Sequence, residues 1–226
     1  TVWLVGRNMH YRIGTRGSKL TLVQSEYVKR RMEEAYPEDT FELVIIKTTG
    51  DKVTDKPLAA IGTKGLFVKE IEEALLSGSI DMAVHSMKDM PAECATGLTF
   101  AKAWKREDCR DVLILKTAGS FSKLPSGAVI GTGSLRRACQ LAMLRPDIQF
   151  TAIRGNVDTR INKLMDDSYG LDGIVLAAAG LNRLGRSSEI TEYLDPEVVI
   201  PAPAQGVLAI ETAEVNTELL DKINAL

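Results

Sequence analysis

Cysteine, histidine and aromatic residues are scarce in this chain of 226 residues. The three cysteines, Cys94, Cys109 and Cys139, show no C-x-x-C spacing, and His10 and His85 are the two histidines. This pattern argues against a disulfide framework, a structural zinc site and a histidine-rich metal centre. We therefore expect free thiols and no bound metal.

Long hydrophobic runs and an excess of charge of one sign are also missing. The sequence has no apolar run of about 18 residues, as a membrane span requires, and Val2 to Val5 is too short for the core of a signal peptide. With 28 basic and 30 acidic side chains the net charge is -2, which gives no general attraction to nucleic acid or anionic membranes. We expect a cytoplasmic protein that binds neither, and any anion site must be local.

What the chain does contain is a regular alternation of short apolar strands and amphipathic helices. A strand near residues 11–13 is followed by Ser18, a plausible N-cap, and then by apolar residues at three- and four-residue steps. The same rhythm predicts helices near 67–75, 134–144, 157–165 and from about 215, and strands near 41–47, 80–84, 112–115, 128–131, 148–153, 173–176 and 207–211. The fold class is therefore α/β, with mostly parallel sheets flanked by helices.

One internal repeat indicates two similar lobes. Gly14–Ser18 and Gly131–Ser134 both follow a strand and open a helix. Chance similarity of two glycine-rich turns is the alternative. The chain is expected to cross near Trp104–Asp108 and again near Pro201–Ala204, where prolines favour an extended connector. The expected domains are 10–105 plus 205–226, and 106–204.

Arginines recur where apolar strands end. They are Arg16, Arg136, Arg137, Arg154 and Arg160. Ligands of open α/β sheets bind beyond the carboxyl ends of the strands, and guanidinium groups bind carboxylates or phosphates bidentately. A single such arginine is usually a solvated surface residue, but five at successive strand ends favour an anion-binding cleft. The glycine-rich turns lack dinucleotide and phosphate-loop spacing, although Lys64 could still meet an anion.

The segment Val84–Pro91 carries polar side chains out of a buried strand. Asp89 is the candidate catalytic carboxylate, because an ionised acid beside arginines could stabilise a developing cation or shuttle a proton. A turn or cap residue is the alternative interpretation of Asp89, and a structural imidazole that of His85.

Taken together, these strings resemble the porphobilinogen deaminase family, also called hydroxymethylbilane synthases. The resemblance covers about residues 10–226 and rests on long motifs in order: Ile13–Leu20, Lys64–Glu70, Val84–Pro91, Arg106–Asp111, Gly131–Arg137, Arg154–Arg160, Ala179–Gly185 and Pro203–Gly206. It implies a transferase of tetrapyrrole and heme biosynthesis, which releases ammonia as it joins four porphobilinogens into hydroxymethylbilane on a covalent dipyrromethane cofactor. It also implies two lobes resembling type-II periplasmic binding proteins, with the active site between them.

The resemblance further implies roles for individual residues. Asp89 would be the essential carboxylate, a buried acid among arginines that stabilises the cationic intermediate. The substrate- and cofactor-binding residues would be Arg16, Ser18, Lys64, Ser86, Lys88, Thr132, Ser134, Arg136, Arg137, Arg154, Gly155, Arg160, Arg183 and Gln205. Each porphobilinogen brings two carboxylates, so an arginine-rich site suits the growing chain.

The chain departs from the family at its C-terminal end. The family's cofactor-attachment cysteine lies in a Gly-Gly-Cys context in a third domain, and none of the three cysteines here has that context. We therefore expect a monomeric fragment without covalent cofactor and with little or no turnover of its own, in which residues 1–9 are a candidate fusion segment. The rival interpretation is a non-catalytic anion-binding module with the same two lobes.

Overall fold

The fold is taken from a computed structural model, which describes residues 8–49 and 68–226. The chain divides into two compact units, Thr1–Lys105 with Val207–Leu226, and Arg106–Gly206. The sequence placed the return to the first unit at residue 205, and the contacts place it at Val207. Lys64, the turn around it and most of the candidate fusion segment lie outside the described residues.

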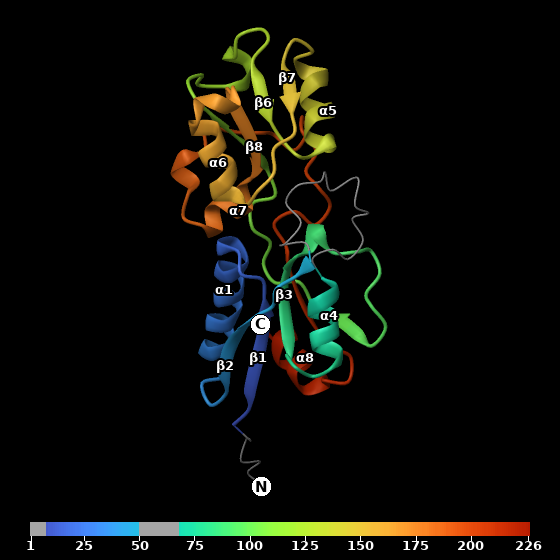
Figure 1. Cartoon of the computed structure of the whole chain (residues 1–226). Helices are drawn as coiled ribbons and strands as arrows, with labels where there is room; N and C mark the ends of the chain where they lie inside the picture. Colours follow the sequence, from blue (N-terminus) through green and yellow to red (C-terminus); the bar gives the residue numbers. More distant parts are fainter. Residues whose placement is uncertain (1–7, 50–67) are drawn as a thin grey trace. The chain divides into compact units, whose positions relative to one another are not determined.

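The first unit is built on a five-stranded sheet in the order β2-β1-β3-β10-β4 (Figure 1). β1 pairs in parallel with β2 and β3, whereas β10 is antiparallel to both β3 and β4. In chain order the elements are β1 (His10–Thr15), α1 (Lys19–Ala35), β2 (Thr40–Ile45), α4 (Lys69–Leu76), β3 (Met82–Ser86), the 3-10 turn η1 (Met87–Asp89), β4 (Leu98–Phe100), β10 (Leu208–Ala213) and α8 (Thr217–Asn224).

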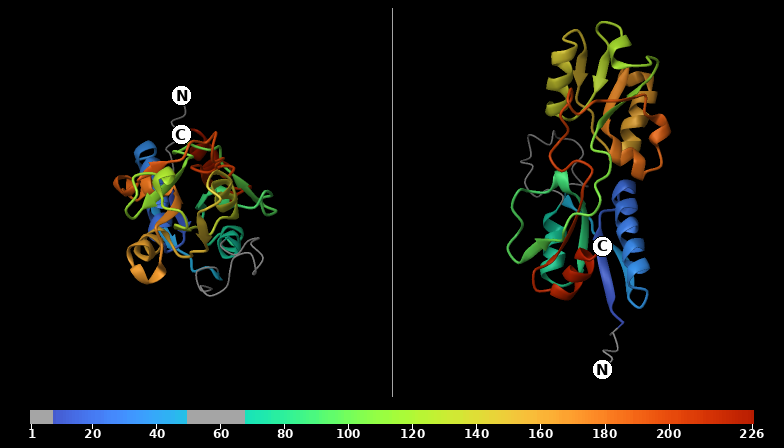
Figure 2. Two further views of the ribbon diagram at one scale, coloured as in Figure 1. Left: turned by 90° about the horizontal axis from the view of Figure 1, so that it is seen from above. Right: turned by 180° about the vertical axis from the view of Figure 1, so that it is seen from behind.

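Side-chain alternation along the strands sends two apolar sets to opposite faces of this sheet. One face packs against α1 and α8 through Ile13, Met82 and Val84, and the other packs against α4 through Ala83. Both the front and rear views show α1 lying along the strand β1 (Figures 1 and 2). Ser86 is in phase with Met82 and Val84, so it lies on the face that α1 covers.

The second unit repeats this plan with a sheet in the order β7-β6-β8-β5-β9. β6 pairs in parallel with β7 and β8, and β5 is antiparallel to β8 and β9. Its elements are β5 (Asp111–Leu115), η2 (Phe121–Lys123), β6 (Val129–Gly131), α5 (Leu135–Leu144), β7 (Gln149–Thr151), α6 (Val157–Met165), η3 (Asp167–Tyr169), β8 (Gly173–Ala177), α7 (Ala178–Arg183), η4 (Ser187–Glu189) and β9 (Glu192–Tyr193). The shared strand order explains the internal repeat of Gly14–Ser18 in Gly131–Ser134.

Each sheet holds one antiparallel strand, and that strand follows a crossing of the chain. β5 begins soon after the chain enters the second unit, and β10 begins as it returns to the first. The other strands are joined within their own unit by helices or loops that allow parallel directions. Both sheets are therefore mostly parallel, as the alternation of strands and helices predicts, with one reversed strand each.

Two of the expected helix starts are capped by a serine, one of them Ser18, the N-cap that the sequence predicts. The Ser18 hydroxyl oxygen accepts from the backbone N–H of Thr21 at 3.4 Å, and that of Ser134 accepts from Arg137 at 3.4 Å. The Asn156 side chain caps α6 in the same way, accepting from Thr159 N–H at 2.9 Å. These caps fix where α1, α5 and α6 begin, and so where their remaining N–H groups point.

Candidate functional site

In the first unit the expected site residues gather at one edge of the sheet. Arg16 and Ser18 follow β1, while Ser86, Lys88 and Asp89 follow β3. β1 and β3 are parallel neighbours, with Gly14 paired to Ala83. Their carboxyl ends therefore lie at the same edge, where ligands of α/β sheets bind.

Asp89 is exposed, and so is Lys88. The expectation of a buried acid at this position is wrong. β3 ends at Ser86, and the single turn η1, closed by the bond from Met90 N–H to the Met87 carbonyl at 3.1 Å, carries both charged side chains past the end of the sheet. An exposed carboxylate at this edge is accessible to a ligand.

Ser86 is held from the helix side by a buried glutamine. Gln24 lies on the inner face of α1 and is 1% exposed, and its Nε2 donates to Ser86 Oγ at 3.0 Å. Gln24 and Ser86 come from different elements and are 62 residues apart. The hydroxyl of a proposed ligand-binding residue is thus oriented by a side chain that the sequence did not single out.

The opposite face of the same strand carries a buried acid and imidazole. His85 Nε2 lies 3.0 Å from Glu211 Oε2, and the two side chains are 7% and 0% exposed. Cys94 Sγ lies 3.6 Å from Glu211 Oε1. Burial and the adjacent Glu211 carboxylate raise the pKa of the Cys94 thiol to about 11, which keeps it a poor nucleophile. This environment is that of a structural imidazole, which was the alternative interpretation of His85.

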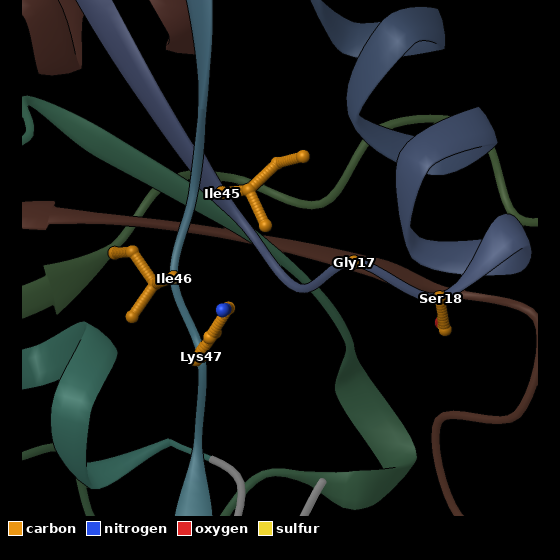
Figure 3. Close-up of a pocket in the computed structure, with 5 residues that line it drawn as sticks. All are labelled: Gly17, Ser18, Ile45, Ile46 and Lys47. Carbon is orange, nitrogen blue, oxygen red and sulfur yellow. The ribbon is translucent and has the colours of Figure 1, made fainter.

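A pocket lies beside the start of α1 (Figure 3). It is lined by Gly17 and Ser18 from the turn before the helix, by Ile45 at the end of β2, and by Ile46 and Lys47 just after that strand. The side chains of Ile45 and Ile46 point to opposite sides of their strand (Figure 3). The lining combines apolar surface with an amine and a hydroxyl, a combination that suits a ligand with an apolar body and an anionic group.

In the second unit the centre of the site is Asp111, at the start of β5. It is 0% exposed. Arg137 donates to its Oδ1 through Nε at 3.0 Å and Nη2 at 2.7 Å, and Arg136 Nη1 lies 2.7 Å from its Oδ2. Gln205 Nε2 also donates to Oδ1, at 2.9 Å. The acid that arginines surround is Asp111 rather than Asp89.

The electrostatics of Asp111 follow from these contacts. Burial alone would raise the pKa of the carboxyl, but the charge of Arg137 and hydrogen bonds from Arg136, Arg137 and Gln205 outweigh burial and lower it. Arg137 is 7% exposed, and its remaining Nη1 donates to the Val175 carbonyl at 3.2 Å. All three side chains are thus engaged within the unit, and Arg136, which also donates to the Ile200 carbonyl at 2.5 Å, is the half-buried one.

The remaining expected residues of this unit lie around the starts of α5 and α6. Thr132 is buried, and its Oγ1 accepts from Ser134 N–H at 3.2 Å. Arg160 Nε donates to the Gly155 carbonyl at 2.8 Å, in the turn that follows β7 and Arg154. β6 and β7 are parallel neighbours, so these two turns lie at the same sheet edge.

Arg183 contacts a crossing segment of the chain rather than a strand end. It ends α7, and its Nη2 donates to the Gly206 carbonyl at 2.7 Å. Gly206 has φ +90, and a Cβ there would lie 2.4 Å from the Glu107 carbonyl oxygen. Only glycine fits this close approach, and Arg183 helps to hold the two crossing segments of the chain together.

The helix starts at these edges carry uncompensated positive dipoles. Neither α1 nor α5 has an acidic residue in its first turn. In α6 the first-turn Asp158 is paired with Arg186. A first turn without an acidic residue leaves the positive end of the helix dipole available to an anion, so the starts of α1 and α5 favour a negatively charged ligand.

Comparison with known proteins decides which family this arrangement belongs to. Residues 11–221 match the family model described as porphobilinogen deaminase, dipyromethane cofactor binding domain. The chain belongs to the porphobilinogen deaminase family. It is 98% identical over 218 residues to the porphobilinogen deaminase of Lachnospira eligens, covering 96% of this chain and 74% of that protein. Against the Clostridioides difficile porphobilinogen deaminase the identity is 52%, covering 96% of this chain and 72% of that one.

Solved structures of distant sequence share the fold of this family member. The methionine binding protein MetQ matches with a TM-score of 0.54 and 13% identity, covering 96% of this chain and 89% of that one. The periplasmic VFT2 domain of Bordetella pertussis BvgS matches with a TM-score of 0.52 and 15% identity, covering 95% and 85%. At such low identity these matches show the fold alone, a two-lobe arrangement like that of type-II periplasmic binding proteins.

Two further observations concern the part of the chain that the structure describes. None of its helices is long and apolar enough to cross a membrane. No group of three or more histidine, cysteine, aspartate or glutamate side chains is placed there to hold a metal ion.

Sequence reasoning missed three of the buried polar residues that support the site. Asp111 begins an apolar strand, Glu211 lies inside another, and Gln24 lies on the apolar face of a helix. The sequence held a signal for them, namely a polar side chain on a face of a strand or helix that is otherwise apolar. Such a side chain is rarely buried without a partner.

Proposed function

We propose that this chain supplies the substrate- and cofactor-binding groups and the catalytic carboxylate of a hydroxymethylbilane synthase. In that reaction porphobilinogen loses ammonia and is coupled, unit by unit, into the linear hydroxymethylbilane. The observation that carries the proposal is the placement of the expected binding residues at the carboxyl ends of parallel neighbouring strands, beside helix starts without an acid in the first turn. That placement suits a ligand with several carboxylates.

The binding groups divide into those that meet the ligand and those that hold them in place. Arg16, Ser18, Ser86 and Lys88 in the first unit would bind carboxylates of substrate or cofactor. In the second unit Thr132, Ser134, Arg136, Arg154, Gly155, Arg160 and Arg183 have this role, and Lys64 keeps it as a prediction. Arg137 and Gln205, both buried against Asp111, would act by keeping Arg136 and its helix in position.

The donor set fits the dipyrromethane group that the family model names. Guanidinium, ammonium and hydroxyl groups at the strand ends complement its carboxylates. When bound, the dipyrromethane supplies the pyrrole ring to which the first substrate is joined. The thiol of Cys94, with its raised pKa and its contact to Glu211, is unsuited to form the covalent link.

Asp89 would act on the positive charge that develops as ammonia leaves. Its carboxylate is exposed beyond the end of β3, where a ligand can reach it. A fixed negative charge near the pyrrole nitrogen stabilises the cation relative to the neutral ground state, which lowers the barrier. The adjacent Lys88 would hold a substrate carboxylate so that the ring stays beside Asp89.

The test is an Asp89→Asn substitution at the aligned position of the full-length Lachnospira eligens enzyme. We expect porphobilinogen to bind nearly as well while turnover falls at least about a hundredfold, because one preorganised electrostatic group contributes about that much. Glu93→Gln, also an exposed acid after β3, is the matched control and should leave turnover unchanged. Near-normal hydroxymethylbilane formation by the Asn variant would exclude this role, and retained turnover with lost binding would assign Asp89 to binding alone.

A further inference from the structure

The polar side chain of Gln24 is buried in a way that costs stability. It is 1% exposed on the inner face of α1, among Val28 and Met32, and its Nε2 donates to Ser86 Oγ at 3.0 Å. Its Oε1 is buried and has no hydrogen-bond partner among the described residues. A buried amide with one unpaired oxygen is unfavourable compared with an apolar side chain of similar volume. Packing alone therefore does not account for a glutamine here.

The hydrogen bond from Gln24 determines which further hydrogen bonds Ser86 can make. A serine hydroxyl has one proton to donate and two lone pairs to accept with. Because Gln24 N–H occupies a lone pair of Ser86 Oγ, the hydroxyl proton is left to point away from α1. Ser86 ends β3 and is half-buried, at the edge of the sheet where Arg16 and Asp89 also lie. A hydroxyl whose proton points outward donates to an anionic oxygen.

We propose that Gln24 is a positioning residue that fixes Ser86 as a hydrogen-bond donor to a carboxylate of porphobilinogen or of the growing pyrrole chain. This inference rests on the proposed function of the edge formed by β1 and β3. Gln24 does not touch the ligand. It restricts the rotation of the Ser86 hydroxyl in the folded protein. The entropic cost of ordering that group is therefore already met before the ligand binds, which favours binding.

The experiment measures kcat, KM for porphobilinogen and the melting temperature of the full-length Lachnospira eligens enzyme. The variants carry Gln24→Leu, Gln24→Glu, Ser86→Ala and the double change Gln24→Leu with Ser86→Ala at the aligned positions. Ser25→Ala is the matched control, because Ser25 is buried on the same helix and its Oγ has no partner among the described residues.

A positioning role predicts a pattern that loss of packing cannot produce. Ser86→Ala and Gln24→Leu should each raise KM about tenfold, since a hydrogen bond to a charged group contributes roughly that factor, with kcat nearly unchanged. The double variant should also show about a tenfold rise rather than the roughly hundredfold product of two independent effects. The melting temperature of Gln24→Leu should equal or exceed that of the unmodified enzyme, and Ser25→Ala should alter no kinetic constant.

Other outcomes separate failure of this inference from failure of the proposed function. A rise in KM for Ser86→Ala without one for Gln24→Leu would overturn the positioning role and leave the site intact. An unchanged KM for Ser86→Ala would remove Ser86 from the binding site itself. Gln24→Glu should weaken binding at least as much as Gln24→Leu, because a carboxylate would accept the Ser86 proton. Retained affinity in Gln24→Glu would mean that Ser86 donates its hydroxyl proton to residue 24 instead of accepting a hydrogen bond from it. That result also overturns the proposal.

Discussion

Replacing Asp111 with alanine should unfold the second unit far more readily than any change at its surface. Asp111 is 0% exposed and is the partner of two guanidinium groups, one of which, that of Arg137, is itself 7% exposed. Both arginines lie within 2.7 Å of a carboxylate oxygen. The substitution removes the negative charge and leaves the buried Arg137 cation without its counter-ion.

The magnitude follows from that imbalance. Removing one partner of a buried ion pair costs about 3–5 kcal/mol, because the remaining charge is desolvated without compensation. This is a large part of the roughly 5–15 kcal/mol by which a domain is usually stable. Asp111→Asn retains the shape and an acceptor oxygen, so we expect a smaller loss. Adding Arg137→Met to Asp111→Ala removes the stranded charge, and we expect the double variant to be more stable than Asp111→Ala alone.

Urea denaturation followed by far-UV circular dichroism measures the loss. Native-state hydrogen exchange of the β5 and β8 amides assigns it to the second unit, which matters because a chain with two units need not unfold in one step. The control is Asp147→Ala, which removes an exposed carboxylate paired with Arg145 at 2.6 Å and should have a far smaller effect. Equal losses for Asp111→Ala and Asp147→Ala would refute the argument from burial.

The same carboxylate predicts how stability depends on pH. The pKa of Asp111 is lower in the folded chain than in the unfolded chain, where it is about 3.9. Its stabilisation is therefore complete above the unfolded value and is lost as the pH falls through the folded value. The slope of unfolding free energy below about pH 4 should be smaller in Asp111→Asn than in the unmodified chain.

Three further outcomes follow from local geometry. Ser134→Ala removes the N-cap of α5 and should destabilise the second unit by about 1 kcal/mol, whereas Ser134→Asp should restore it, as measured by urea denaturation. Gly206→Ala places a Cβ 2.4 Å from the Glu107 carbonyl oxygen at φ +90. We therefore expect this substitution to lower the melting temperature more than the same substitution at an exposed glycine, and an unchanged melting temperature would contradict this expectation. Iodoacetamide at neutral pH should label the exposed Cys139 much faster than Cys94, whose thiol pKa is about 11, and peptide mass spectrometry would reveal the reverse order.

Local signals in the sequence predicted most of the secondary structure. Ser18 and Ser134 marked helix starts because a side-chain oxygen at that position satisfies N–H groups that the helix leaves unpaired. The short strands β4 and β9, Leu98–Phe100 and Glu192–Tyr193, escaped prediction. Segments of two or three residues have no periodicity to detect, and their pairing with β10 and β5 supplies the stability that defines them.

The sequence predicted the positions of several candidate residues along the strands, and the burial of the two acids differs from the prediction. The strand-end arginines and the Ser86–Asp89 segment lie at sheet edges, as the alternation of strands and helices implied. The sequence could not indicate that Asp89 is exposed and that Asp111 is the acid buried among arginines. Which acid is desolvated depends on how far each strand extends and on which residues its neighbours present, and neither is a local property.

The α/β class, the repeated strand–turn–helix plan and the starts of α1 and α5 can be read from the amino-acid sequence. These features depend on residues within a few positions of one another, whose backbone preferences and charges act locally. In contrast, packing between distant segments brings Arg136, Arg137 and Gln205 to one carboxylate and lets Gln24 donate to a serine 62 residues away. Such contacts form where separate strands and helices close against each other, and burial then sets which polar groups must find a partner.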